Sequence, residues 1–307
     1  MSVLDRAIVR LLPAVPKPVV RRISGRYIAG TELEDACRVV KQLNAHGRMA
    51  TIDVLGEEIS SAREARAIAG AYEDVFRTIG ARELDSNVSV KPTALGLKLD
   101  YDIFRANLEY VVELAAVIGN FVRIDMEDSS TTDDTLRAYR ELREAGHENV
   151  GIVLQACLRR TVDDIRALSQ LGLNVRLCKG IYVEPPEIAS QGFQEVRDNF
   201  VLALEELLGA GAYVGIATHD DWLVREAKRL LVEHPRERHE YEFQMLLGVR
   251  SSLGESIISK GHRLRIYVPF GRQWYTYSMR RLQENPKIAG YIAADTIGRL
   301  IPGRNGL

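Results

Sequence analysis

The sequence has few cysteines, no long apolar run and almost no net charge. Its three cysteines, Cys37, Cys157 and Cys178, show no CxxC spacing, which argues against a disulfide framework and a zinc site and suits a reducing cytoplasm. No apolar run approaches the roughly 18 residues of a membrane-spanning helix. The 41 basic and 42 acidic residues give a net charge of −1, so the overall charge does not favour nucleic-acid binding.

The composition is that of a globular enzyme. Hydrophobic residues make up 46% and charged residues 27% of the 307 residues. A chain of this length can bury most of its apolar surface. It therefore needs neither a disulfide nor a structural metal to fold.

Strand-like and helix-like segments alternate along the chain. Predicted strands lie at Met49–Leu55, Asn87–Lys91, Phe121–Met126, Val150–Gln155, Asn174–Cys178, Ala212–Thr218, Tyr241–Leu246 and Arg263–Pro269. Predicted helices follow at 61–79, 102–118, 132–145, 161–171, 192–209, 220–233, 250–260 and 274–284. A doubly wound open sheet shows the same alternation, but it usually has fewer strands and a GxGxxG turn, which is absent here.

We therefore predict an α/β fold, a (βα)8 TIM-type barrel with an additional N-terminal helical segment. Residues 1–46 form that segment, packed on the barrel, and Leu33, Cys37, Val40 and Leu43 give its helical stripe. Residues 47–285 form the catalytic barrel, and residues 286–307 form a C-terminal tail.

Polar side chains gather where the predicted strands end, which is where the active site of a (βα)8 barrel lies. Strand bodies in a parallel barrel are buried and should be apolar, so this enrichment at one end is informative. A helix cap is the simpler explanation for Asp128 or Asp220 alone. Caps do not require the long cationic and amide side chains also found there, and the set therefore indicates a site: Lys91, Gln155, Arg176 and Lys179.

The last predicted helix carries a second polar group of residues. Its period places four side chains within about 100° of one another: Tyr277, Arg280, Arg281 and Glu284. Adjacent arginines are well suited to hold a carboxylate. No HxH, HExxH or GxSxG motif supplies a metal site or a serine nucleophile. The residues therefore suggest an anionic substrate and redox chemistry carried by a bound organic cofactor.

Six stretches of the sequence resemble the proline dehydrogenase family. They are Arg123–Asp128, Arg176–Tyr182, Ala217–His219, Glu242–Leu246, Arg265–Gly271 and Tyr277–Glu284. Their order and spacing agree with the family from about residue 25 to residue 286. The short length resembles the single-activity bacterial enzymes rather than the fusions with an aldehyde dehydrogenase.

The resemblance implies a non-covalent FAD and the oxidation of L-proline to Δ1-pyrroline-5-carboxylate, the first step of proline catabolism. It also implies that the electrons pass to a membrane quinone. The enzyme is then expected in the cytoplasm, with a peripheral contact to the inner face of the cell membrane. Hand-over of the product to pyrroline-5-carboxylate dehydrogenase is a further expectation.

The resemblance also assigns roles to residues. The substrate-binding set is Lys91, Asp125, Leu246, Tyr267, Tyr277, Arg280 and Arg281, of which Lys91 and the two arginines hold the carboxylate. Glu57 is the gating acid that pairs with an arginine of the last helix. The cofactor-binding set is Met126, Gln155, Arg176, Lys179, Gly180, Thr218, His219, Gln244 and Glu284, and no residue is assigned to a metal.

Three other functions compete with this one. A Schiff-base lyase of the barrel aldolase type would use Lys91 or Lys179, since both end strands. An amino-acid-binding barrel without a cofactor would bind proline but not turn it over. Hydroxyproline oxidation is the third, but related hydroxyproline oxidases tend to carry a smaller residue where this sequence has Tyr277.

The substitution Arg281→Lys should raise the Michaelis constant for proline strongly, because an ammonium group cannot reproduce a bidentate guanidinium contact with a carboxylate. Steady-state kinetics with proline as the varied substrate measure this. An unchanged constant would remove Arg281 from the substrate site.

Overall fold

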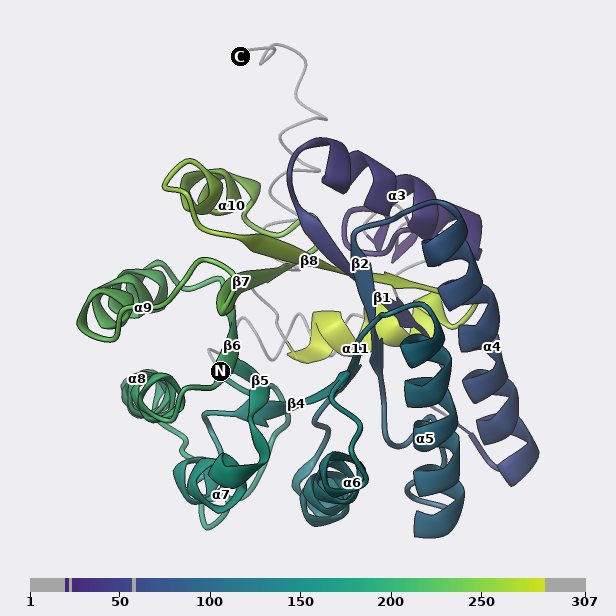
Figure 1. Cartoon of the computed structure of the whole chain (residues 1–307), viewed down its shortest axis with the longest axis horizontal. Coiled ribbons are helices and arrows are strands. Elements are labelled where there is room, and N and C mark those ends of the chain that lie inside the picture. The colour runs from purple at the N-terminus through teal and green to yellow at the C-terminus, as the bar shows by residue number, and fades with distance from the viewer. Residues whose placement is uncertain (1–19, 22–23, 57–58, 285–307) are drawn as a thin grey trace.

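The computed structural model describes residues 20–21, 24–56 and 59–284, with residues 280–284 described as backbone alone. Eight parallel strands form a closed barrel in sequence order, and the last strand pairs with the first (Figure 1). The predicted (βα)8 class is therefore confirmed. A doubly wound sheet is excluded, because an open sheet would leave two edge strands unpaired.

The eight strands have nearly the predicted bounds. They are β1 Met49–Val54, β2 Ser86–Val90, β3 Val122–Ile124, β4 Val150–Gln155, β5 Asn174–Cys178, β6 Tyr213–Ala217, β7 Tyr241–Leu246 and β8 Leu264–Phe270. The main difference is β3, which is half as long as the segment 121–126 that the apolar pattern predicts. Only its three residues pair with both neighbouring strands.

The helices surround the barrel (Figure 1). They are α3 Leu33–Ala45, α4 Ala62–Ala81, α5 Tyr101–Val117, α6 Thr132–Glu144, α7 Thr161–Leu168, α8 Phe193–Gly209, α9 Asp221–Glu233, α10 Ser251–Ile258 and α11 Trp274–Glu284. The predicted helix 161–171 divides into α7 and a short 3-10 turn that ends at Gly172, whose φ of 62° is left-handed. Asp128 and Asp220 do cap helical segments, through Ser130 N and Trp222 N.

The apolar core lies between the sheet and the helices, where alternate strand residues such as Val88, Ile152 and Val175 are fully buried. The barrel interior is polar instead. It holds side chains that are less than a tenth exposed although they are charged, including Arg123, Arg176 and Arg265. Most such barrels fill this space with branched apolar residues.

Two strand glycines make room for these long interior side chains. A Cβ on Gly151 would lie 2.5 Å from both Arg123 Nη1 and the backbone oxygen of Asn174. A Cβ on Gly215 would overlap the amide of Gln244. A larger residue at either position would displace a buried polar group.

Residues 24–30 fasten α11 across one end of the barrel (Figure 1). Ser24 Oγ donates a hydrogen bond to Ser278 Oγ at 2.6 Å, and Ala29 N donates to the oxygen of Pro269 in β8. The predicted tail, 286–307, lies outside the described residues. No helix within the described ranges is long and apolar enough to cross a membrane.

The substitution Gly151→Ala should lower the free energy of unfolding by about 2 kcal/mol, because the new methyl group meets backbone as well as the end of Arg123. Gly70→Ala in α4 is the matched control, since nothing lies within 4 Å of its added Cβ. That control should stabilise the protein by roughly 0.5–1 kcal/mol. Urea unfolding of both variants measures the difference, and equal stabilities would contradict the packing role of Gly151.

Candidate active site

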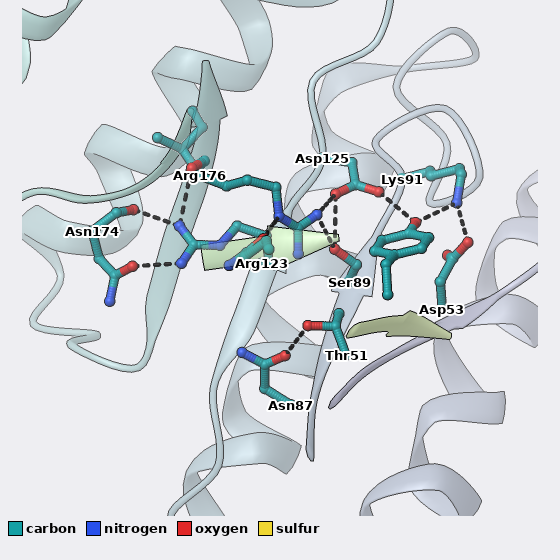
Figure 2. Close-up of polar contacts among 12 residues, drawn as sticks. Thr51, Asp53, Asn87, Ser89, Lys91, Arg123, Asp125, Asn174 and Arg176 are labelled. Carbon is teal, nitrogen blue, oxygen red and sulfur yellow. Dashed lines mark hydrogen bonds and ion pairs between the residues drawn. The ribbon is translucent and has the colours of Figure 1, made fainter. Parts of the chain in front are cut away.

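Asp125, which directly follows β3, joins three strands at the carboxyl end of the barrel. Its Oδ1 accepts hydrogen bonds from Ser89 Oγ and Arg176 Nη1, both at 2.8 Å (Figure 2). Its Oδ2 accepts one from the hydroxyl of Tyr267 at 2.9 Å. Burial, and then the negative charge of Asp125, raise the pKa of Tyr267 well above its usual value. The phenol therefore stays protonated and acts as a donor.

Arg176 of β5 is held on several sides. Besides Asp125, it contacts Gln244, whose Oε1 accepts from Nε at 2.5 Å, and Ser89, whose Oγ accepts from Nη1 at 3.1 Å. The centre of the guanidinium lies 5.3 Å from the centroid of the Tyr267 ring. Among the described residues, none accepts a hydrogen bond from Nη2. This amino group can therefore donate to a bound ligand.

Lys91 lies on the other side of Tyr267. Its Nζ forms an ion pair with Asp53 Oδ2 at 2.6 Å and donates to the Tyr267 hydroxyl at 3.4 Å (Figure 2). Asp53 lies in β1 and is completely buried. Neither Asp53 nor Ser89 is among the residues predicted from the sequence. The signal for Asp53 is a carboxylate inside an otherwise largely apolar strand.

The ends of β4, β6 and β7 add further polar groups. Gln155 Nε2 donates to the backbone oxygen of Glu127 at 2.9 Å. His219 Nε2 accepts from the backbone N–H of Leu246 at 2.9 Å. Since an N–H can only donate, this imidazole nitrogen carries no proton, and the neutral ring is protonated on Nδ1.

A second ion cluster is centred on Asp220, between β6 and α9. Its carboxylate accepts from Lys179 at 2.6 Å and from Arg197 at 2.7 and 2.8 Å. Partial burial by itself raises the pKa of Asp220, but the hydrogen bonds from Arg197 and Lys179 outweigh that effect and hold the pKa far below its usual value. Lys179 is thereby fixed at the barrel mouth, and its Nζ lies 4.6 Å from the centroid of the Phe193 ring.

The predicted residues fall into four groups. Those joined in one hydrogen-bonded network are Lys91, Asp125, Arg176, Gln244 and Tyr267. Those at neighbouring strand ends are Gln155, Lys179, Gly180, Thr218, His219 and Leu246. Two are buried among apolar residues: Met126 in the main core and Tyr277 beside Ile28 and Leu55. Glu57 lies outside the described residues, as do the side chains of Arg280, Arg281 and Glu284 in α11.

The backbone at Gly180 packs closely against side chains at the end of β4. Its φ is +93°, and a Cβ there would overlap Cys157 Sγ and lie 3.0 Å from Gln155 Oε1. Only glycine fits this position. The nearby donors of Arg176 and Lys179 are suited to an electron-rich cofactor such as a flavin.

The chain resembles known proteins over most of its length. A family model described as proline dehydrogenase matches residues 36–293. Proline dehydrogenase 2 of Bacillus subtilis (strain 168) is 38% identical over 87% of this chain and 88% of that protein. Proline dehydrogenase of Deinococcus radiodurans is 34% identical over 88% of each.

The fold also matches solved structures. Proline utilization A (PutA) from Bdellovibrio bacteriovorus, inactivated by N-propargylglycine, matches with a TM-score of 0.82 and 25% identity over 91% of this chain. PutA from Corynebacterium freiburgense matches with a TM-score of 0.76 at 20% identity, which concerns the fold alone. This chain spans 36% and 34% of those two longer chains.

The charge of Asp220 should stabilise the fold in a pH-dependent way. Its folded-state pKa is depressed below the ordinary 3.8, so its contribution is full above that value and is lost as the pH falls through the folded-state pKa. Asp220→Asn keeps the helix cap but removes the charge. The free energy of unfolding of the variant should be lower by roughly 1 kcal/mol at pH 7, after allowance for screening. This difference between parent and variant should become smaller below pH 3.8. Urea unfolding between pH 7 and pH 3 measures it, and a gap that widens in acid would contradict the assignment.

Proposed function

The chain belongs to the proline dehydrogenase family, and from that premise we propose that it oxidises L-proline to Δ1-pyrroline-5-carboxylate with a non-covalently bound FAD. The family is one of flavin-dependent oxidoreductases, and its model covers most of this chain. The observation that carries the proposal is the network of Lys91, Tyr267, Asp125 and Arg176 at the barrel mouth. We propose that the substrate and cofactor sites meet at these residues.

The substrate carboxylate is the natural partner of the cations at this end of the barrel. We propose that Lys91, Arg280 and Arg281 bind it. Asp53 holds Lys91 Nζ at 2.6 Å, beside the Tyr267 hydroxyl that would face the substrate. The bonds from Ser24 and Ala29 hold α11 and β8 in place, which positions the backbone that carries both arginines.

The ring of proline would lie among Leu246, Tyr267 and Tyr277. Tyr277 is only 4% exposed and packs on Leu55 and Ile28, so its position is well defined. Related hydroxyproline oxidases tend to carry a smaller residue at this position, which supports proline over hydroxyproline. Glu57 is the proposed gate of this pocket.

When bound, the flavin supplies the hydride acceptor. Fixing the carboxylate aims one C–H bond of the ring, which lowers the entropic part of the barrier. The amine must be neutral at the moment of transfer, because its lone pair stabilises the iminium product. Arg176, with Nη2 available, would stabilise the negative charge that develops at the cofactor on reduction.

Three further parts of the proposal rest on the family alone. Electrons would leave to a membrane quinone, which requires a peripheral contact between this cytoplasmic enzyme and the inner face of the cell membrane. The product would be handed to pyrroline-5-carboxylate dehydrogenase.

A Schiff-base lyase is the less suitable function for this site. An attacking lysine must lose its proton, and the buried ion pair between Lys91 and Asp53 opposes that loss. Lys179 is likewise engaged with Asp220.

The purified protein should be yellow, and anaerobic L-proline should bleach its flavin absorption. The bleaching rate should increase with pH, since the amine must be neutral to react. Stopped-flow spectroscopy over a pH series measures both. A flavin spectrum that proline leaves unchanged would contradict the proposed function, and a colourless protein that forms a borohydride-trapped adduct with a keto acid would favour the lyase.

Asp125→Asn should slow flavin reduction by about 100-fold, because a neutral amide cannot hold both Arg176 and Tyr267 in their present orientation. Rapid mixing with saturating proline gives the rate. Asp100→Asn, at the N-terminal cap of α5, is the control and should react like the parent protein. Equal rates in the two variants would show that Asp125 does not organise the site.

A further inference from the structure

We propose that Glu242 is a positioning residue that sets the direction of the Gln244 amide and, through it, the orientation of Arg176. The inference rests on the proposed function, in which Arg176 faces the cofactor. No role follows for Glu242 from the family resemblance, although it lies within one of the six matching stretches. It is 1% exposed, on β7 inside the barrel.

Both oxygens of Glu242 are engaged. Oε1 accepts from Arg265 Nε at 2.6 Å and from Gln244 Nε2 at 2.7 Å. Oε2 accepts from the hydroxyl of Tyr213 at 2.7 Å. Arg265 is itself held by the backbone oxygen of Ala50 in β1. The carboxylate is therefore fixed from β6, β7 and β8.

The chemistry of the partners gives the Gln244 amide one orientation. An ionised carboxylate can only accept, so the amide must turn its NH2 group toward Glu242. A guanidinium can only donate, so the amide oxygen must face Arg176 Nε, where the distance is 2.5 Å. Burial and hydrogen bonding from Arg265 act in opposite directions on Glu242, and its pKa lies below the usual value, so it stays ionised.

The barrel wall supports this arrangement. Gly215 of β6 pairs with both Arg176 and Glu242, and a Cβ at this position would overlap the Gln244 amide. The amide thus occupies space that only glycine leaves open. With Nε bound to Gln244 and Nη1 to Asp125, the plane of Arg176 is fixed, and its Nη2 has a defined direction.

Glu242→Gln/Arg265→Met removes the element that fixes the amide, because a glutamine that no longer faces the donor-only guanidinium of Arg265 can present either its oxygen or its NH2 group. In the holoenzyme, the flavin midpoint potential should fall and kcat should decrease about ten- to hundredfold, while the KM for proline changes little. The control is Tyr213→Phe, which loses the bond to the other oxygen of the same carboxylate. It should lower the melting temperature but leave the potential and kcat unchanged.

A second readout needs no cofactor. The Nε–H of Arg176 is buried and hydrogen-bonded, so it should give a slowly exchanging NMR signal in the apoprotein, assigned by its absence in Arg176→Lys. Its exchange should become at least about tenfold faster in Glu242→Gln/Arg265→Met and stay slow in Tyr213→Phe. In the single variant Glu242→Gln, exchange should also stay slow, because Arg265 can only donate and therefore holds the amide oxygen of residue 242 where the Gln244 NH2 group needs an acceptor.

These measurements distinguish a failure of the proposed function from a failure of the role proposed for Glu242. If the parent protein binds no flavin, the proposed function fails, and the exchange measurement still tests the role of Glu242. Should Glu242→Gln/Arg265→Met not fold, Glu242→Leu/Arg265→Met replaces both buried charges by apolar groups and should show the same fast exchange. Equal exchange rates and potentials in Glu242→Gln/Arg265→Met and Tyr213→Phe, or fast exchange in the single variant Glu242→Gln, would overturn the proposal.

Discussion

The burial of charged side chains inside the barrel is the constraint on which the rest of the structure depends. An ion removed from water is costly unless opposite charges or hydrogen bonds replace the lost solvation. Asp125 meets that requirement for Arg176, and Asp53 meets it for Lys91. The two pairs meet at the hydroxyl of Tyr267, which donates to Asp125 and accepts from Lys91. One polar network therefore crosses the barrel from β5 to β1.

Arg123 is a buried arginine whose solvation is replaced by backbone carbonyl groups. It is 2% exposed, and its Nη1 donates to the backbone oxygens of Ile152 and Asn174 rather than to a carboxylate. Burial, together with repulsion from Arg176, lowers its pKa to about 9. Gly151 supplies the space for it.

The central cations of the barrel interior each have more than one partner. Arg176 contacts Asp125, Ser89 and Gln244, and Lys91 contacts Asp53 and Tyr267. Side chains fixed in this way need little reorganisation when a ligand binds. Tyr277 and α11 instead contact residues 24–30 and Leu55, which belong to no strand.

The sequence by itself determined the order of strands and helices, because the periods of buried residues are local properties. It located β4, β5 and β7 to the residue. It also pointed to Arg176 as a site residue, whereas Gln244 and Tyr267 were assigned through the family resemblance. It could not assign Asp53, Ser89 or Glu242, which read as interruptions in apolar strands. Their partners lie 38, 36 and 23 residues away, in Lys91, Asp125 and Arg265. Only closure of the barrel brings such residues together, because it turns alternate residues of every strand toward one interior where buried charges must pair.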